Sequence, residues 1–152
     1  MHKLSLYLLL SCISFFAFSQ DTTQIVHADR RNSASQQAKP YVILISADGF
    51  RSDFSVKYGA KFLQSREAIG IKANAMIPSY PSLTFPNHYS IVTGLYPSHH
   101  GLVDNRYFDV NSGKEYNMGN KKMVAEGKWY GGTPLWVLAE QQKMISASFY
   151  WV

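Results

Sequence analysis

The 152-residue chain is poor in cysteine and in clustered basic residues. Cys12 is the single cysteine, so the sequence offers no intramolecular disulfide. The formal net charge is +5, but the basic residues are scattered, with Arg30-Arg31 and Lys121-Lys122 as the only adjacent pairs. Because no basic helical stripe is present, a nucleic-acid duplex is not an expected partner, and the charge favours at most the attraction of small anionic substrates.

The sequence also lacks an apolar run long enough to cross a membrane comfortably as a helix, which needs ~20 residues. Its leading apolar stretch, residues 4–18, follows Lys3 and ends in small residues suited to a signal peptidase. We therefore interpret residues 1–19 as a secretory signal peptide cleaved before Gln20, and we expect an exported, periplasmic or extracellular protein without a stable membrane span. Lipid attachment at Cys12 is the less favoured alternative, because it would make the apolar region very short.

The remainder divides into a polar segment and a folded region. Residues 20–39 are rich in polar side chains with no apolar period, which predicts a flexible spacer. Residues 41–45 form a continuous β-branched apolar run, typical of a strand buried on both faces of a parallel sheet. Further strands are expected at 71–77 and 144–152, helices at 58–68, at 85–93 and from Thr133-Pro134 onward, and a loop-rich insert at 96–132.

This order of elements predicts the α/β class with a doubly wound, mostly parallel sheet. Three strands with crossover helices would leave an open sheet edge and much uncovered apolar surface. We therefore expect the chain to be the N-terminal part of a longer protein.

Two oxygen-bearing side chains are the first candidates for chemistry. Asp48 ends the first predicted strand, where ligands gather in open α/β sheets, and its carboxylate could hold a divalent cation. Thr84 lies at or next to the expected N-cap of the 85–93 helix, where the helix dipole and a coordinated metal would both favour its alkoxide. The structural alternatives are an ordinary turn at Asp48-Gly49 and a plain threonine N-cap.

Amide, imidazole and indole groups add further candidates. Asn105 offers an uncharged donor suited to phosphoryl oxygens, although Asp-Asn in a loop is also ordinary turn chemistry. His88, His99 and His100 lack the spacing that would align metal ligands, which favours packing or loop hydrogen bonding. The aromatic residues near the end of the chain, including Trp151, usually belong to a core, although one at a strand tip could stack a base.

Together these residues resemble the nucleotide pyrophosphatase/phosphodiesterase family of the alkaline phosphatase superfamily. The matching segments are Ile-Ser-Ala-Asp-Gly-Phe-Arg at 45–51, Pro-Ser-Tyr-Pro-Ser-Leu-Thr-Phe-Pro-Asn-His-Tyr-Ser at 78–90, Thr-Gly-Leu-Tyr-Pro at 93–97, His-Gly at 100–101, Asp-Asn at 104–105, Trp-Tyr-Gly-Gly-Thr-Pro-Leu-Trp at 129–136 and Phe-Tyr-Trp at 149–151. The resemblance covers almost all of residues 41–152, and it identifies residues 40–152 as the N-terminal part of an alkaline-phosphatase-like catalytic domain.

The resemblance implies zinc-dependent hydrolysis of phosphodiester or pyrophosphate bonds in small nucleotide-like substrates through a phosphothreonine intermediate. It assigns Thr84 as nucleophile and metal ligand, Asp48 as metal ligand and Asn105 as the amide that holds the phosphoryl oxygen. It places Phe85 and Trp151 near the substrate. Two Zn²⁺ ions need about six to eight ligand atoms, so the remaining ligands are expected beyond Val152 and the 152 residues alone are expected to be inactive.

Two other functions are compatible with the sequence. A phosphomonoesterase of the same superfamily would need a basic residue near Thr84 to clamp a dianionic phosphate. Leu83 precedes Thr84 and no Lys or Arg lies within several positions, which favours diesters. The second alternative is a truncated, non-catalytic binding protein that keeps the sheet without the metal site.

Overall fold

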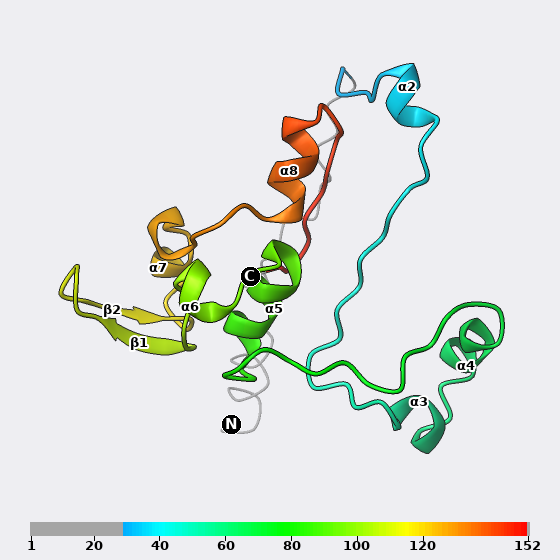
Figure 1. The fold of residues 1–152 in the computed structure, drawn as a ribbon, viewed down its shortest axis with the longest axis horizontal. Helices are drawn as coiled ribbons and strands as arrows, with labels where there is room; N and C mark the ends of the chain where they lie inside the picture. Colours follow the sequence, from blue (N-terminus) through cyan, green and yellow to red (C-terminus); the bar gives the residue numbers. More distant parts are fainter. Residues whose placement is uncertain (1–28, 152) are drawn as a thin grey trace, which may run out of the picture. The chain divides into compact units, whose positions relative to one another are not determined.

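The structure is a computed structural model that describes residues 29–151. The chain divides into two compact units, Met1–Arg31 and Asn32–Val152, and the helices and strands labelled in Figure 1 belong to the second unit. The predicted signal peptide at residues 1–19 lies outside the described part, as does the first half of the predicted spacer. None of the described helices is long and apolar enough to cross a membrane.

The second unit consists of short helices and one hairpin. In chain order they are α2 (Ala34–Gln37), α3 (Phe54–Lys57), α4 (Lys61–Glu67), α5 (Thr84–Thr93), α6 (Pro97–His100), β1 (Arg106–Asp109), β2 (Lys114–Asn117), α7 (Lys121–Val124), the 3-10 turn η2 (Gly127–Trp129) and α8 (Leu135–Gln141). Helix α2 lies inside the predicted spacer, where the Ser33 side chain accepts a hydrogen bond from the backbone N–H of Gln36.

Helix α5 confirms the helix predicted at residues 85–93. Leu83 is its N-cap with an extended backbone, so Thr84 is the first helical residue, next to the cap as expected. Pro86 fits the first turn because the N–H that proline lacks would have no partner within the helix there. Gly94 ends the helix with a φ of 69°, a left-handed conformation that glycine adopts without a Cβ penalty.

Two other predicted helices are also confirmed, with shorter limits. Helix α4 falls within the 58–68 prediction, and α8 begins directly after Pro134, which serves as its N-cap. Proline before a helix has a fixed φ and cannot continue a preceding helix, so the Thr133-Pro134 signal marked the start correctly.

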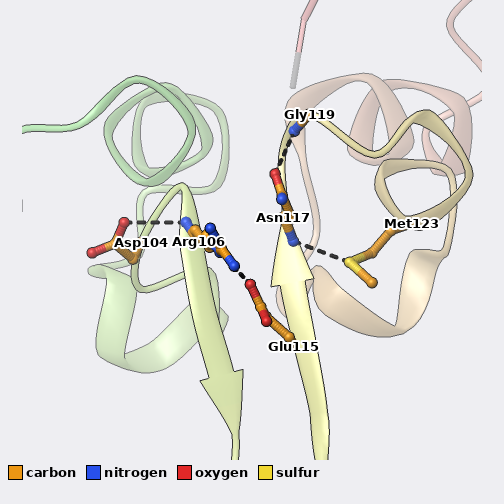
Figure 2. A network of polar contacts seen from close by, with 6 residues as sticks. All are labelled: Asp104, Arg106, Glu115, Asn117, Gly119 and Met123. Atoms are coloured by element: carbon orange, nitrogen blue, oxygen red, sulfur yellow. Dashed lines mark hydrogen bonds and ion pairs between the residues drawn. The ribbon is translucent and has the colours of Figure 1, made fainter.

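The only sheet among residues 29–151 is the antiparallel pair β1–β2, which forms within residues 96–132, where a loop-rich insert is predicted. Arg106 pairs with Asn117 and Tyr107 pairs with Tyr116 in the register. Figure 2 shows Arg106 reaching diagonally across the hairpin to form an ion pair with Glu115. At the end of β2, the Asn117 N–H donates to Sδ of Met123 at 3.0 Å, which links the hairpin to α7, and the Gly119 N–H donates to Asn117 Oδ1 at 2.9 Å.

The doubly wound parallel sheet is not confirmed in the described residues. The predicted strands at 41–45 and 71–77 lie within the two long segments drawn between α2 and α3 and between α4 and α5 in Figure 1, and neither forms a ladder. Residues 144–151 also contain no strand. Val42 is 88% exposed and Ile71 is fully exposed, because neither apolar run has a neighbouring strand to cover it.

The core lies around α5, α6 and the hairpin. Its fully or almost fully buried members are Tyr89, Val92, Leu102, Tyr116 and Trp129. The hydroxyl groups of Tyr116 and Tyr130 share a hydrogen bond of 3.1 Å, and burial raises the pKa of both phenols. The aromatic residues therefore contribute both packing and a neutral internal hydrogen bond, and together they hold the hairpin against α5.

Candidate functional site

The first candidate pair comes together at the start of α5. The hydroxyl of Thr84 donates a hydrogen bond of 3.1 Å to Oδ2 of Asp48, a residue 36 positions earlier in the chain. Leu83, and not Thr84, occupies the N-cap position of α5, and its side chain makes no capping bond. The plain N-cap alternative is therefore wrong for Thr84, because Leu83 is the N-cap residue and the Thr84 hydroxyl donates to the carboxylate of Asp48.

Asp48 lies in a tight turn that follows the apolar segment at residues 41–45. The N–H of Phe50 donates to the carbonyl of Ala47 at 3.3 Å, and Gly49 has a φ of 66°. The positive φ favours glycine at this position. The carboxylate of Asp48 is exposed, so the turn presents a charged group to solvent beside the half-buried Thr84.

Asn105 is fixed through both its backbone and its side chain. Its carbonyl accepts a hydrogen bond of 2.9 Å from the N–H of Met118, immediately before the β1–β2 ladder begins. Its Oδ1 accepts a hydrogen bond of 3.0 Å from the backbone N–H of Phe85, the second residue of α5. Since an N–H can only donate, the amide oxygen faces α5 and the amide nitrogen of Asn105 keeps its hydrogens for another acceptor.

A hydrogen-bonded network holds the loop that leads into Thr84. The N–H of Ser79 donates to Oδ1 of Asn87 at 3.1 Å, and the hydroxyl of Ser79 donates to that of Ser90 at 3.1 Å. Oγ of Ser90 is also 3.0 Å from Nε2 of His100. The loop is thus tied to α5 at two points one turn apart, which limits the positions that Thr84 can take.

His100 is the buried anchor of this network, at 1% exposure. The N–H of Leu102 donates to Nδ1 at 3.2 Å, so Nδ1 carries no proton and Nε2–H is the donor to Ser90. Burial lowers the pKa of His100, and a backbone hydrogen bond to Pro86 opposes this effect. The ring is therefore a neutral structural group, as the interpretation of this histidine as a hydrogen-bonding residue predicted.

His88 lies one turn after Thr84 on the same helix. Its Nδ1 is 2.7 Å from the carbonyl oxygen of Thr84, which can only accept, so Nδ1 carries a hydrogen. The imidazole packs edge-to-face on the ring of Trp151 at 5.9 Å between centroids, and Trp151 packs in the same way on Trp136 at 6.5 Å. His88 thus connects the helix start to Trp151.

The two aromatic residues proposed to lie near the substrate are both half-buried but make different contacts. The side chain of Phe85 is half-buried and packs against the core cluster, while its backbone N–H binds Asn105. Trp151 is also half-buried, and its Nε1 is buried with no hydrogen-bond partner among the described residues. The structure thus brings together Asp48 with Thr84, Phe85 with Asn105, and His88 with Trp151, all around the first turn of α5.

The Asp48–Thr84 pair has the donor chemistry of part of a metal site. Two oxygens on one tetrahedral zinc, with Zn–O distances of about 2.0–2.2 Å, lie roughly 3.3–3.6 Å apart. The 3.1 Å between Thr84 Oγ1 and Asp48 Oδ2 is close to that separation. Across residues 29–151 no three His, Cys, Asp or Glu side chains gather as a ligand group. The pair therefore fits as two ligands of a cation whose coordination requires further groups.

Comparison with known proteins identifies the family. The sequence profile of the Type I phosphodiesterase / nucleotide pyrophosphatase family matches residues 42–152. An uncharacterized pyrophosphatase/phosphodiesterase of Schizosaccharomyces pombe is 37% identical over 145 residues, which are 95% of this chain and 30% of that protein. Ectonucleotide pyrophosphatase/phosphodiesterase family member 1 of Homo sapiens is 39% identical over 114 residues, covering 74% of this chain and 12% of that protein.

The corresponding family member 3 of Bos taurus is 36% identical over 114 residues, covering 74% of this chain and 13% of that protein. The chain belongs to the Type I phosphodiesterase / nucleotide pyrophosphatase family, which confirms the resemblance seen in its motifs. It spans less than a third of the length of each of these relatives. The family places the chain in the α/β class.

Sequence reasoning missed the residues that support this site. The sequence patterns do not point to Ser79, Asn87 or Ser90, and for His88 they indicate only packing or hydrogen bonding. One signal was available for His88, because a residue four positions after Thr84 lies on the same helix face. The loop contacts of Ser79 had no comparable signal, since the path of residues 78–83 depends on the tertiary fold.

Proposed function

We propose that the product of the intact gene hydrolyses phosphodiester or pyrophosphate bonds in nucleotide-like substrates, with Thr84 as the nucleophile. The observation that carries the proposal is the hydrogen bond from Thr84 Oγ1 to Asp48 Oδ2 at the N-terminus of α5. A hydroxyl used only as a helix cap would be satisfied within the helix, whereas this one is held by a carboxylate outside it. Family membership supports the same chemistry.

In the proposed first step, Oγ1 of Thr84 attacks phosphorus as the bond to the leaving oxygen breaks on the opposite side. The proton now shared with Asp48 is lost to water before the attack. A divalent cation bound by both oxygens, with zinc as the proposed metal, would favour this loss by stabilising the alkoxide. Water then cleaves the Thr84–phosphorus bond, which releases the phosphoryl product and restores the hydroxyl.

Asn105 donates a hydrogen bond to a non-bridging phosphoryl oxygen in this proposal. Its Oδ1 accepts from the Phe85 N–H, so its amide hydrogens are available to a phosphoryl oxygen whose charge increases in the transition state. Trp151 is the proposed stacking surface for a base or leaving group, with Phe85 beside it. The proposed parallel sheet would cover the apolar runs at 41–45 and 71–77, and export by the predicted signal peptide would place the enzyme outside the cytoplasm.

The test is zinc-dependent hydrolysis of the p-nitrophenyl ester of thymidine monophosphate by the product of the intact gene. We expect turnover that a chelator abolishes and zinc restores, a loss of at least roughly 1,000-fold in Thr84→Ala, and partial activity in Thr84→Ser. Thr93→Ala is the matched control, because Thr93 lies in the same helix and its hydroxyl binds only the local carbonyl of Tyr89 and the N–H of Leu95.

Turnover that is unaffected by Thr84→Ala would overturn the nucleophile assignment. Absence of turnover on the diester, together with rapid hydrolysis of p-nitrophenyl phosphate, would favour the phosphomonoesterase alternative. Absence of both activities in a folded, zinc-loaded protein would favour the non-catalytic binding protein.

A further inference from the structure

One peptide group at the start of α5 is held at both ends by side chains. The carbonyl of Thr84 accepts a hydrogen bond of 2.7 Å from Nδ1 of His88. The N–H of the same peptide group, which belongs to Phe85, donates a hydrogen bond of 3.0 Å to Oδ1 of Asn105. The first peptide plane of the helix is therefore fixed by residues from two separate parts of the chain.

The hydrogen bonds of this group all run in one direction. His88 donates to the carbonyl, which increases the charge separation in the peptide and makes its N–H a better donor. The N–H donates to Asn105 Oδ1, which in turn makes the Asn105 amide hydrogens better donors. In a series of hydrogen bonds of this kind, each bond is strengthened by roughly 10–30%. The last group in this series is the Asn105 amide nitrogen, which has hydrogens left for a ligand.

His88 is placed for this role by its helix and by one neighbour. As the fourth residue after Thr84, its side chain lies over the first turn of α5. The edge-to-face contact with Trp151 at 5.9 Å between ring centroids restricts the rotation of the imidazole. The ring therefore keeps Nδ1 directed at the Thr84 carbonyl.

We infer that His88 is a positioning residue that acts through the Thr84–Phe85 peptide group to orient and polarise Asn105 toward a phosphoryl oxygen. The role of Asn105 in this inference rests on the proposed function. The relay, meaning the hydrogen bonds that lead from His88 through the Thr84–Phe85 peptide group to Asn105, does not depend on the proposed function. In the proposed arrangement His88 touches neither the phosphorus nor the cation. Its effect is on kcat, because the Asn105 amide is needed most when charge builds on the phosphoryl oxygen.

Two substitutions at His88 separate the relay from simple packing. In His88→Asn the amide nitrogen occupies nearly the place of Nδ1, so donation to the Thr84 carbonyl is retained while most of the ring is lost. In His88→Leu the apolar volume is retained and the donor is lost. For the intact gene product we expect His88→Leu to lower kcat about 10-fold with little change in KM, and His88→Asn to restore most of it.

Exposed His99, changed to Leu, is the matched control and is expected to leave kcat unchanged. A double-mutant cycle with Asn105→Ala adds a second criterion. If His88 acts through Asn105, His88→Leu costs little more once Asn105 is absent, so the two effects are strongly non-additive. Additive effects of the two substitutions on kcat would overturn the relay. So would equal kcat values for His88→Asn and His88→Leu when the two variants have equal unfolding midpoints.

A readout that does not require turnover distinguishes failure of the relay from failure of the proposed function. The side-chain ¹⁵N resonance of Asn105, assigned by its loss in Asn105→Gln, is expected to move upfield in His88→Leu and to stay in place in His88→Asn. If the resonance behaves in this way while Thr84→Ala keeps full activity, the relay stands and the proposed nucleophile falls. If the resonance does not respond to His88→Leu, the relay is wrong whatever the activity.

Discussion

Thr84 Oγ1 and Asp48 Oδ2 are joined by a hydrogen bond of 3.1 Å between an α5 residue and a turn 36 positions earlier. The bond places the proposed nucleophile beside a carboxylate at the N-terminus of a helix, where the helix dipole favours negative charge on the threonine oxygen. Thr84 is thereby separated from the capping role that threonine usually has at a helix start.

Replacing Asp48 with Asn should remove the carboxylate that we propose as a metal ligand while keeping the shape of the side chain. We expect kcat/KM for the thymidine diester to fall by about 100-fold or more, with a higher zinc concentration needed for half-maximal activity. Asp53→Asn is the control, because Asp53 is in an exposed ion pair with Arg51 and such pairs contribute about 0–1 kcal/mol. Equal zinc requirements in the two variants would argue against Asp48 as a ligand.

Asn105→Ala should remove the proposed donor to the phosphoryl oxygen. Loss of one such donor typically costs about 10²–10³ in kcat, and we expect a smaller change in KM. Asn111→Ala, in the turn between β1 and β2, is the control and should retain activity. A KM effect without a kcat effect would mean that Asn105 binds substrate and transition state equally.

His100 should make stability depend on pH. Because burial lowers its pKa below the usual 6.5, the unfolded chain binds the proton more readily. Its contribution to folding is therefore complete above about pH 6.5 and is lost as the pH falls toward the lowered value. In urea unfolding, His100→Gln should cost about 1–3 kcal/mol at pH 8 and flatten the decline between pH 7 and 5. Exposed His99→Gln should leave that profile unchanged.

Trp151→Ala should weaken substrate binding if its ring stacks on a base. Base stacking on an aromatic side chain contributes about 1–3 kcal/mol, so KM for the thymidine ester should rise roughly 5- to 150-fold. The adjacent Tyr150 is 96% exposed, and Tyr150→Ala is the matched control. An unchanged KM in Trp151→Ala would limit this ring to its contacts with His88 and Trp136.

The elements with local signals were predictable from the sequence. Gly94 and Pro134 mark a helix end and a helix start through their own backbone preferences, so α5 and α8 were placed correctly. The β1–β2 hairpin was missed because its strands are short and lie among glycines that suggested a loop. Its Tyr107–Tyr116 pair is a cross-strand contact that only the register reveals.

The parallel sheet and the support of the site depend on partners that local sequence does not specify. The apolar run at 41–45 indicates a need for burial, but pairing requires a neighbouring strand, and in the described residues the run stays exposed. Asp48 and Thr84 were separate candidates because of their places beside a predicted strand and a predicted helix, and it was the family resemblance that joined them as metal ligands. The roles of Ser79, Ser90 and His100 arise from tertiary contacts between a loop and two helices.

The most direct test of the central proposal is to trap the covalent intermediate. The zinc-loaded gene product would be mixed with p-nitrophenyl thymidine monophosphate, quenched in acid within one turnover, digested and mapped by mass spectrometry. A thymidylyl group on Thr84 is expected, formed together with a stoichiometric burst of p-nitrophenol, with no adduct in Thr84→Ala. An adduct on another residue, or full turnover with no adduct at any time point, would contradict the assignment of Thr84 as the nucleophile.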